Sequence, residues 1–274
     1  MFDKRVIILS GHYGSGKTNI AVNLALELKK TSDCAKRRDC HETADFRLGH
    51  LRQSKLPSPK TRRLCATDAL LSQSVPKESK FLGSLTRENV ALADLDIVNP
   101  YFRARQSLKR LEEVNVRFIA SAYADTNIDA PSLPQEIYTI TDDRELSVIL
   151  DVGGDDRGAL ALGRISAALK DENNYEMLLV ANMYRPLTRT AADTVTVMRE
   201  IEKACGLPFT GIINNSNLGQ ETTAQTVLDS IEYAAEVSRF TGLPVVMTAV
   251  REDLCGELSG KVERLFPLKI ETSY

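Results

Sequence analysis

A complete phosphate-binding pattern lies near the start of this chain, where residues 11–18 read Gly-His-Tyr-Gly-Ser-Gly-Lys-Thr. Its three glycines let backbone N–H groups turn toward a polyphosphate at the positive N-terminus of a helix. Lys17 can then reach the β and γ phosphate oxygens, and the Thr18 hydroxyl can hold Mg²⁺. An apolar run over residues 5–10 precedes the pattern and a helical apolar period follows it, so we expect a nucleoside triphosphate site; a ligand-free turn is the alternative. The residues expected to hold the nucleotide are Gly11, Gly14, Ser15, Gly16, Lys17 and Thr18.

Two carboxylates stand at the end of a second apolar stretch, as Asp94 and Asp96 in Ala-Asp-Leu-Asp. A carboxylate at the end of a buried strand is unfavourable without a partner. Mg²⁺, Lys17 or an attacking water would each provide one. A simple turn or capping role for either aspartate remains the alternative.

A third apolar stretch, over residues 147–152, ends in Asp151 and is followed by two glycines. An aspartate in this position is typical of the Walker B pattern, in which it orients the Mg²⁺ shell. Gly153 and Gly154 would let the backbone approach the γ-phosphate and move on hydrolysis. The pattern is weak alone, but it gains weight beside a complete phosphate-binding loop.

Amide side chains follow a fourth apolar stretch, in Ile-Ile-Asn214-Asn215-Ser-Asn217. An amide can donate and accept at once, which suits the edge of a nucleotide base. An asparagine-rich turn is the alternative. No N-K-x-D motif stands here to specify guanine, so we expect ATP as the nucleotide and Asn215 as the base contact.

Apolar strand patterns alternate with helical patterns through most of the chain, which predicts an α/β fold with a mostly parallel sheet covered by helices on both faces in three layers. Ligands of such sheets bind beyond the carboxyl ends of the strands, where the motifs above should gather. The strands are expected at residues 5–10, 90–95, 116–120, 147–152, 177–181, 210–213 and 244–248, with helices at 190–204 and 222–241 among others.

Composition favours a compact protein of the cytoplasm. The chain has 274 residues, 43% of them hydrophobic, and a net charge of −2. This charge argues against a protein whose overall electrostatic field attracts nucleic acids or membranes. Its start leads directly into the first strand, and its five cysteines form no C-x-x-C pair, as expected for free thiols in a reducing compartment. No apolar run is long enough to span a bilayer. Residues 261–270 resemble an amphipathic anchor only faintly, since Pro267 would interrupt any helix.

Residues 31–89 break the alternation and are expected to be an irregular, disordered insert in a single domain formed by residues 1–30 and 90–274. The insert carries twelve Lys and Arg against seven Asp and Glu, so a nucleic-acid arm is one alternative. A zinc site is another, but zinc sites normally have a close pair of ligands at each end, and Cys34, Cys40 and His41 followed by the distant His50 and Cys65 do not show this spacing. The segment could also be foreign to the native coding sequence, since long loops within compact domains are uncommon.

Taken together, these motifs resemble the MinD/ParA/CobQ-type branch of P-loop NTPases, which includes the nitrogenase iron protein and ATPases that insert nickel into carbon-monoxide dehydrogenase. The likeness extends to nucleotide-binding proteins of this branch that lack an assigned substrate. The matching segments are residues 11–18, 93–96 with Pro100, 150–154 and 212–215.

The resemblance implies a role for each matching residue. Lys17 would stabilise the transferred phosphate, Thr18 would ligate Mg²⁺, and Asp151 would hold the water shell of the metal. Asp96 would position the hydrolytic water, and Asn215 would read adenine. One departure is His12, which stands where many members carry a signature lysine that reaches the nucleotide of a partner subunit.

The resulting expectation is a Mg²⁺-dependent, slow ATPase that acts as a nucleotide-driven switch for a second copy of itself or for a partner protein. The alternative is a ligase or kinase that activates a small carboxylate, like cobyrinate amidase or dethiobiotin synthetase, with Arg103, Arg185 and Arg189 as substrate contacts. A third reading is a nucleotide-dependent binding module whose contact arm is the 31–89 insert.

Overall fold

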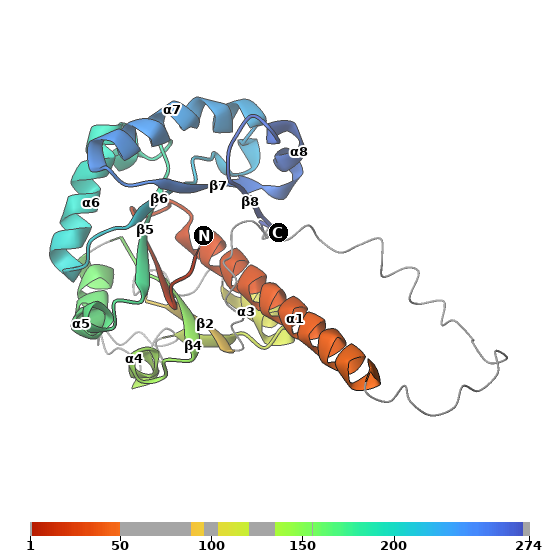
Figure 1. Ribbon diagram of the computed structural model, residues 1–274. Coiled ribbons are helices and arrows are strands. Elements are labelled where there is room, and N and C mark those ends of the chain that lie inside the picture. The colour runs from red at the N-terminus through yellow and green to blue at the C-terminus, as the bar shows by residue number, and fades with distance from the viewer. Residues whose placement is uncertain (1, 50–88, 96–103, 121–134, 155, 271–274) are drawn as a thin grey trace.

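The computed structural model of this chain describes residues 2–49, 89–95, 104–120, 135–154 and 156–270 (Figure 1). Its strands are β1 (Val6–Ser10), β2 (Asn89–Asp94), β3 (Arg117–Ala120), β4 (Leu146–Asp151), β5 (Tyr175–Ala181), β6 (Gly211–Asn214), β7 (Val245–Arg251) and β8 (Leu265–Leu268). Its helices are α1 (Lys17–Gly49), α3 (Ala104–Glu113), α4 (Thr139–Asp142), α5 (Asp156–Glu172), α6 (Ala191–Cys205), α7 (Ala224–Thr241) and α8 (Cys255–Leu258). Single 3₁₀ turns are η1 (Gln135–Tyr138), η2 (Pro186–Thr188), η3 (Gly219–Glu221) and η4 (Glu252–Leu254).

In the described part of the chain, every strand joins one parallel sheet in the order β3-β2-β4-β1-β5-β6-β7-β8. The first strand, β1, therefore lies in the middle, between β4 and β5. The chain passes to one side of β1 for β2 to β4 and to the other side for β5 to β8. In sheets of this kind, the ligand crevice lies at the carboxyl ends of the strands where this direction changes.

Helices cover both faces of the sheet (Figure 1). Ile7 and Leu9 of β1 lie in the core beneath α1, whereas Val6 and Ile8 lie in the core shared with α5 and α6. This alternation along one strand fixes its register, because a shift of one residue would exchange the two faces. The predicted three-layer α/β fold is confirmed, and the seven predicted strands are present as β1 to β7.

Helix α1 is longer than expected, because it continues beyond residue 30 to Gly49 and extends past the edge of the sheet (Figure 1). The first half of the helix packs on the sheet through Ile20, Leu24 and Leu28. No glycine or proline interrupts residues 17–48, so nothing in the sequence ends the helix earlier. The prediction that residues 31–49 are irregular is wrong, and residues 50–88 of the predicted insert lie outside the described residues.

The eighth strand was not predicted. Among the described residues it pairs with β7 alone, at the edge of the sheet, where Pro267 is tolerated because an edge strand need not donate from every residue. Phe266 and Leu268 are buried in the core, so this segment belongs to the fold. Beyond it, Asn23 of α1 accepts from the backbone N–H of Lys269 at 3.0 Å.

No helix in the described residues is both long and apolar enough to cross a membrane.

A buried ion pair fixes the base of the central strand. Arg5, directly before β1, donates through Nε to the Glu172 carboxylate at the end of α5 at 2.6 Å. Its Nη1 donates to the carbonyls of Asp143 at 3.1 Å and Leu146 at 2.8 Å, which flank the start of β4. Both side chains of the pair are almost fully buried. The hydrogen bonds from Arg5 hold the pKa of Glu172 below its ordinary value of 4.5.

We expect Glu172→Gln to lower the free energy of unfolding at pH 7 by about 3 kcal/mol, because it leaves the Arg5 cation buried without its counter-ion. Since the pKa of Glu172 is lower in the folded state than in the unfolded chain, its stabilisation is present above about pH 4.5 and is lost as the pH falls through the lowered pKa. Urea unfolding at pH 7 and pH 3.5 checks this. The exposed Glu145→Gln is the control, and a wild-type advantage that is equal at both pH values would contradict the assignment.

Candidate functional site

The glycine-rich loop (residues 11–18) connects β1 to α1 at the carboxyl edge of the sheet. Its glycines adopt positive φ angles, 152° at Gly11, 74° at Gly14 and 91° at Gly16. At Gly16 a side chain would also overlap the Nδ2 atom of Asn215, so two constraints favour glycine there. Helix α1 begins at Lys17, so its first N–H groups, which have no partner within a helix, lie at the loop.

Lys17 is 5% exposed and is held within the glycine-rich loop. Its ammonium group donates to the carbonyl oxygens of Gly11 at 3.0 Å and His12 at 3.3 Å. The side chain therefore bends back over the loop that it follows, as the motif requires if the ammonium group is to reach a phosphate there. This position agrees with the predicted role of Lys17 but does not test it.

Two residues from distant loops bind the outer carbonyls of the glycine-rich loop. Asn215, after β6, donates from Nδ2 to Ser15 O at 2.6 Å, and Arg185, after β5, donates from Nε to Gly14 O at 2.9 Å. In a trans peptide the carbonyl and the following N–H point in opposite directions. The bond to Ser15 O therefore turns the N–H of Gly16 away from Asn215, toward the interior of the loop.

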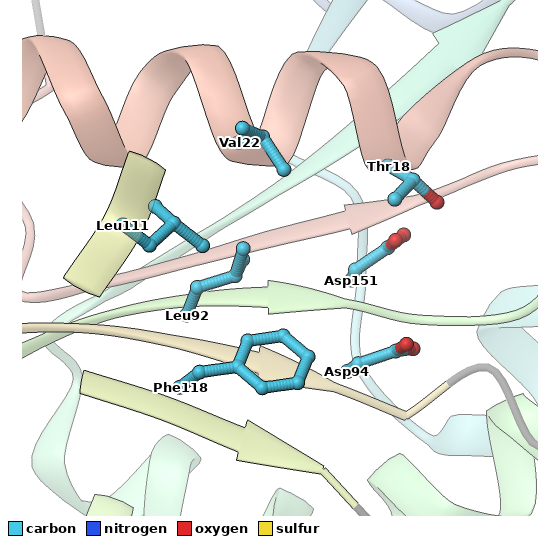
Figure 2. A pocket seen from close by; sticks show the side chains of 7 residues that line it. All are labelled: Thr18, Val22, Leu92, Asp94, Leu111, Phe118 and Asp151. Carbon is cyan, nitrogen blue, oxygen red and sulfur yellow. The ribbon is translucent and has the colours of Figure 1, made fainter. Parts of the chain in front are cut away.

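Asp94 and Asp151 are neighbours in the sheet, because they are directly paired in the register of β2 and β4. Figure 2 shows both carboxylates pointing to the same side as the Thr18 hydroxyl at the start of α1. Asp151 is 2% exposed. Carboxylate and hydroxyl oxygens form the ligand type that Mg²⁺ prefers, so the arrangement is compatible with the predicted metal contacts of Thr18 and Asp151. These three residues line a pocket whose other walls are Val22, Leu92, Leu111 and Phe118.

The segment after β4 packs against the glycine-rich loop. A side chain at Gly154 would overlap the carbonyl oxygen of Gly11 and would lie 3.1 Å from His12 Cα. In addition, the N–H of Val152 donates to Leu9 O at 2.9 Å. Gly154 therefore touches the glycine-rich loop, so a displacement of either segment must be accommodated by the other.

Three buried polar atoms around the loop have no hydrogen-bond partner among the described residues: Ser10 Oγ, Ser15 Oγ and Nδ1 of His12. Buried polar atoms in proteins nearly always have partners. Their concentration at this loop is consistent with a site that receives a polar ligand such as a polyphosphate.

The structure separates several residues that the sequence grouped together. Arg185 contacts the glycine-rich loop, whereas Arg189 is exposed after η2. Asn214 points away from the loop and donates to Ser230 Oγ in α7 at 2.9 Å, which leaves Asn215 as the amide at the site. Asp96 and Arg103 lie outside the described residues, so the predicted catalytic role of Asp96 stays a prediction.

Sequence reasoning missed Asn182, a fully buried residue directly after β5. Its Oδ1 accepts from the N–H of Tyr184 at 3.0 Å and of Asn217 at 3.4 Å, which ties the β5 loop to the β6 loop. An asparagine at the end of a buried apolar strand was the available signal. The same signal was used for Asn215.

No protein-family model matches this sequence, and no curated protein matches it. The solved structures that are similar to it at low identity include the following two. The signal recognition particle 54 kDa protein from Aeropyrum pernix K1 in complex with GDP is 17% identical, with a TM-score of 0.42 over 89% of this chain and 40% of that chain. Cell division protein FtsY from Thermotoga maritima is 18% identical, with a TM-score of 0.45 over 89% of this chain and 61% of that chain. This chain thus spans about half the length of these two proteins, and such weak similarity assigns it neither a family nor an activity.

We expect Gly154→Ala to destabilise the protein by about 1–3 kcal/mol, because the new methyl group must displace the backbone of the glycine-rich loop. Urea unfolding measures this loss. Gly256→Ala in α8 is the matched control, since a methyl group there meets no atom within 4 Å. Equal stability of Gly154→Ala and the wild type would show that the segment after β4 does not pack on the loop as described.

Proposed function

We propose that this chain is a Mg²⁺-dependent ATP-binding protein and slow ATPase that acts as a nucleotide-driven conformational switch. The observation that carries the proposal is the position of Thr18 beside the paired carboxylates Asp94 and Asp151 at the carboxyl edge of the sheet. Lys17 lies in the adjoining loop, where it binds Gly11 O. In this proposal, residues 1–30 and 90–274 form one nucleotide-binding domain. Residues 31–89 leave it as an insert whose first part continues α1.

The nucleotide's phosphates would occupy the glycine-rich loop. Lys17 would exchange the carbonyls of Gly11 and His12 for phosphate oxygens, so its ammonium group has hydrogen-bond acceptors both without and with the nucleotide. The N–H groups at the start of α1 would donate to the same oxygens. Thr18 and Asp151 would hold Mg²⁺, which supplies positive charge to the phosphates when bound. Asp96 would orient the attacking water.

The switch would operate through the contact between Gly154 and the glycine-rich loop. Because a side chain at Gly154 cannot be accommodated beside Gly11, the two backbones already lie in van der Waals contact. Phosphate bound in the loop would therefore bias the position of the segment after β4, and hydrolysis would release it. A second copy of the chain or a partner protein would read this change.

Adenine is proposed as the base on the absence of an N-K-x-D motif after β6. Asn215 would contribute only part of its amide to the base, because one donor already holds Ser15 O. The carboxylate-activating ligase is less well supported. Of its three proposed substrate contacts, Arg185 is engaged by the loop, Arg189 is exposed, and Arg103 is not described.

We expect purified wild-type protein to hydrolyse Mg²⁺-ATP slowly, and Lys17→Ala to lower the turnover by at least about 100-fold through loss of charge at the phosphates. Asp96→Ala should lose hydrolysis while it retains ATP binding. Release of inorganic phosphate measures hydrolysis by each variant. Titration with a fluorescent nucleotide, with GTP run in parallel, measures nucleotide binding. The exposed Lys261→Ala is the control. Turnover that survives both Lys17→Ala and Asp96→Ala would exclude this site as the ATPase centre.

We also expect Asp151→Asn to weaken the dependence of ATP binding on Mg²⁺, because an amide is a poorer ligand for a hard cation than a carboxylate. ATP affinity would be measured with Mg²⁺ in excess over the nucleotide and again after Mg²⁺ has been removed by a chelator. Asp171→Asn on α5, which is exposed, is the control. If Mg²⁺ strengthens ATP binding equally in Asp151→Asn and wild type, the metal is held elsewhere.

A further inference from the structure

Arg185 places a second positive charge against the glycine-rich loop. Its Nε donates to Gly14 O at 2.9 Å, and its guanidinium carbon lies 3.6 Å from the position that a Cβ of Gly14 would take. The side chain is half-buried. Its Nη1 and Nη2 groups make no hydrogen bond to any described residue, so these donors of the guanidinium remain available for a ligand.

The loop that carries Arg185 is anchored firmly. Thr188 donates from its hydroxyl to Asn182 O at 2.7 Å, and the N–H of Arg185 donates to the same carbonyl at 3.2 Å. The Tyr184 hydroxyl donates to Thr226 O in α7 at 2.8 Å. Arg185 therefore projects from a short turn that is fixed at both ends, so its backbone position does not depend on a ligand.

Lys17 and Arg185 are two cations that bind different carbonyls of the glycine-rich loop. Lys17 binds the first carbonyls of the loop, and Arg185 binds Gly14 O. A nucleoside di- or triphosphate carries several negative charges, and the arginine fork matches phosphate oxygens geometrically. Arg185 contacts the glycine-rich loop through Gly14 O. Arg189, four residues later, is exposed and makes no such contact.

We propose that Arg185 is a positioning residue for the phosphates of the bound nucleotide. Its Nε holds Gly14 O, and its remaining donors and its charge act on the β and γ phosphates. The inference rests on the proposed nucleotide site and names one more residue of it, which comes from the β5 loop rather than from the motif.

A purely structural role would have a different signature. If Arg185 only shaped the loop, its loss would lower the affinity for all nucleotides by the same factor and would lower the stability of the protein. If its charge acts on the phosphates, the loss grows with the number of phosphates and depends on salt, since screening weakens charge interactions. Lysine at this position would keep the charge but lose the fork.

The test is displacement of a fluorescent ATP analogue by ATP, ADP and AMP, at low and high salt, from the full chain. We expect Arg185→Gln to weaken ATP and ADP about 10- to 100-fold, the range for hydrogen bonds to a charged group, and to change AMP much less. The salt dependence of ATP binding should become shallower. Arg185→Lys should recover part of the ATP affinity, and Arg189→Gln should behave as wild type.

The outcomes separate the two proposals. Wild-type protein that binds no nucleotide would overturn the proposed function itself. Wild-type protein that binds ATP, together with Arg185→Gln binding it within twofold, would overturn only the role of Arg185. Equal losses for ATP and AMP would do the same. Thermal unfolding of each variant is measured alongside. If Arg185→Gln is unfolded, the ratio of ATP affinity to AMP affinity is compared between Arg185→Lys and wild type. A lower ratio in Arg185→Lys supports the role of Arg185, and an unchanged ratio overturns it.

Discussion

The site depends on which way the peptide groups of the glycine-rich loop face. N–H groups can point into the loop only if the adjoining carbonyls point outward and find donors there. For the carbonyls of Gly14 and Ser15, the structure supplies those donors from Arg185 after β5 and Asn215 after β6. Neither residue belongs to the motif. The conformation of the loop therefore depends on contacts with the segments after β5 and β6 on one side of β1 and with Gly154 after β4 on the other side.

The opposite side of β1 contributes the carboxylates. The pairing of Asp94 with Asp151 follows from the register of β2 on β4, and that register follows from the burial of alternate residues on both faces of the sheet. Sheet packing and site chemistry therefore share one determinant. The buried Arg5–Glu172 pair at the other end of β1 contributes to the same outcome, since it holds the starts of β1 and β4 together.

Most of the sheet could be predicted from the sequence, because β1 to β7 are apolar runs and their helices bury an apolar stripe. The far half of α1 could not, since it lacks a regular apolar period and only the absence of glycine and proline marks it. β8 contains a proline and becomes a strand only through the edge of β7. The motif residues were found from spacing alone. The contacts of Arg185 and Asn215 with the loop join segments 171 and 200 residues apart, and no local pattern encodes them.

The central position of β1 also has a consequence for synthesis of the chain. β1 is made before the other strands of the sheet, yet its neighbours β4 and β5 end at Asp151 and Ala181, and the side-chain oxygen of Asn23 in α1 accepts from the N–H of Lys269. At about 5–20 residues per second, β1 waits roughly ten to thirty seconds for β5. Until β4 and β5 have both been made, β1 lacks at least one of its two neighbouring strands, although its apolar residues are fully buried in the finished fold. The nascent chain therefore exposes an apolar segment that is prone to aggregation during synthesis.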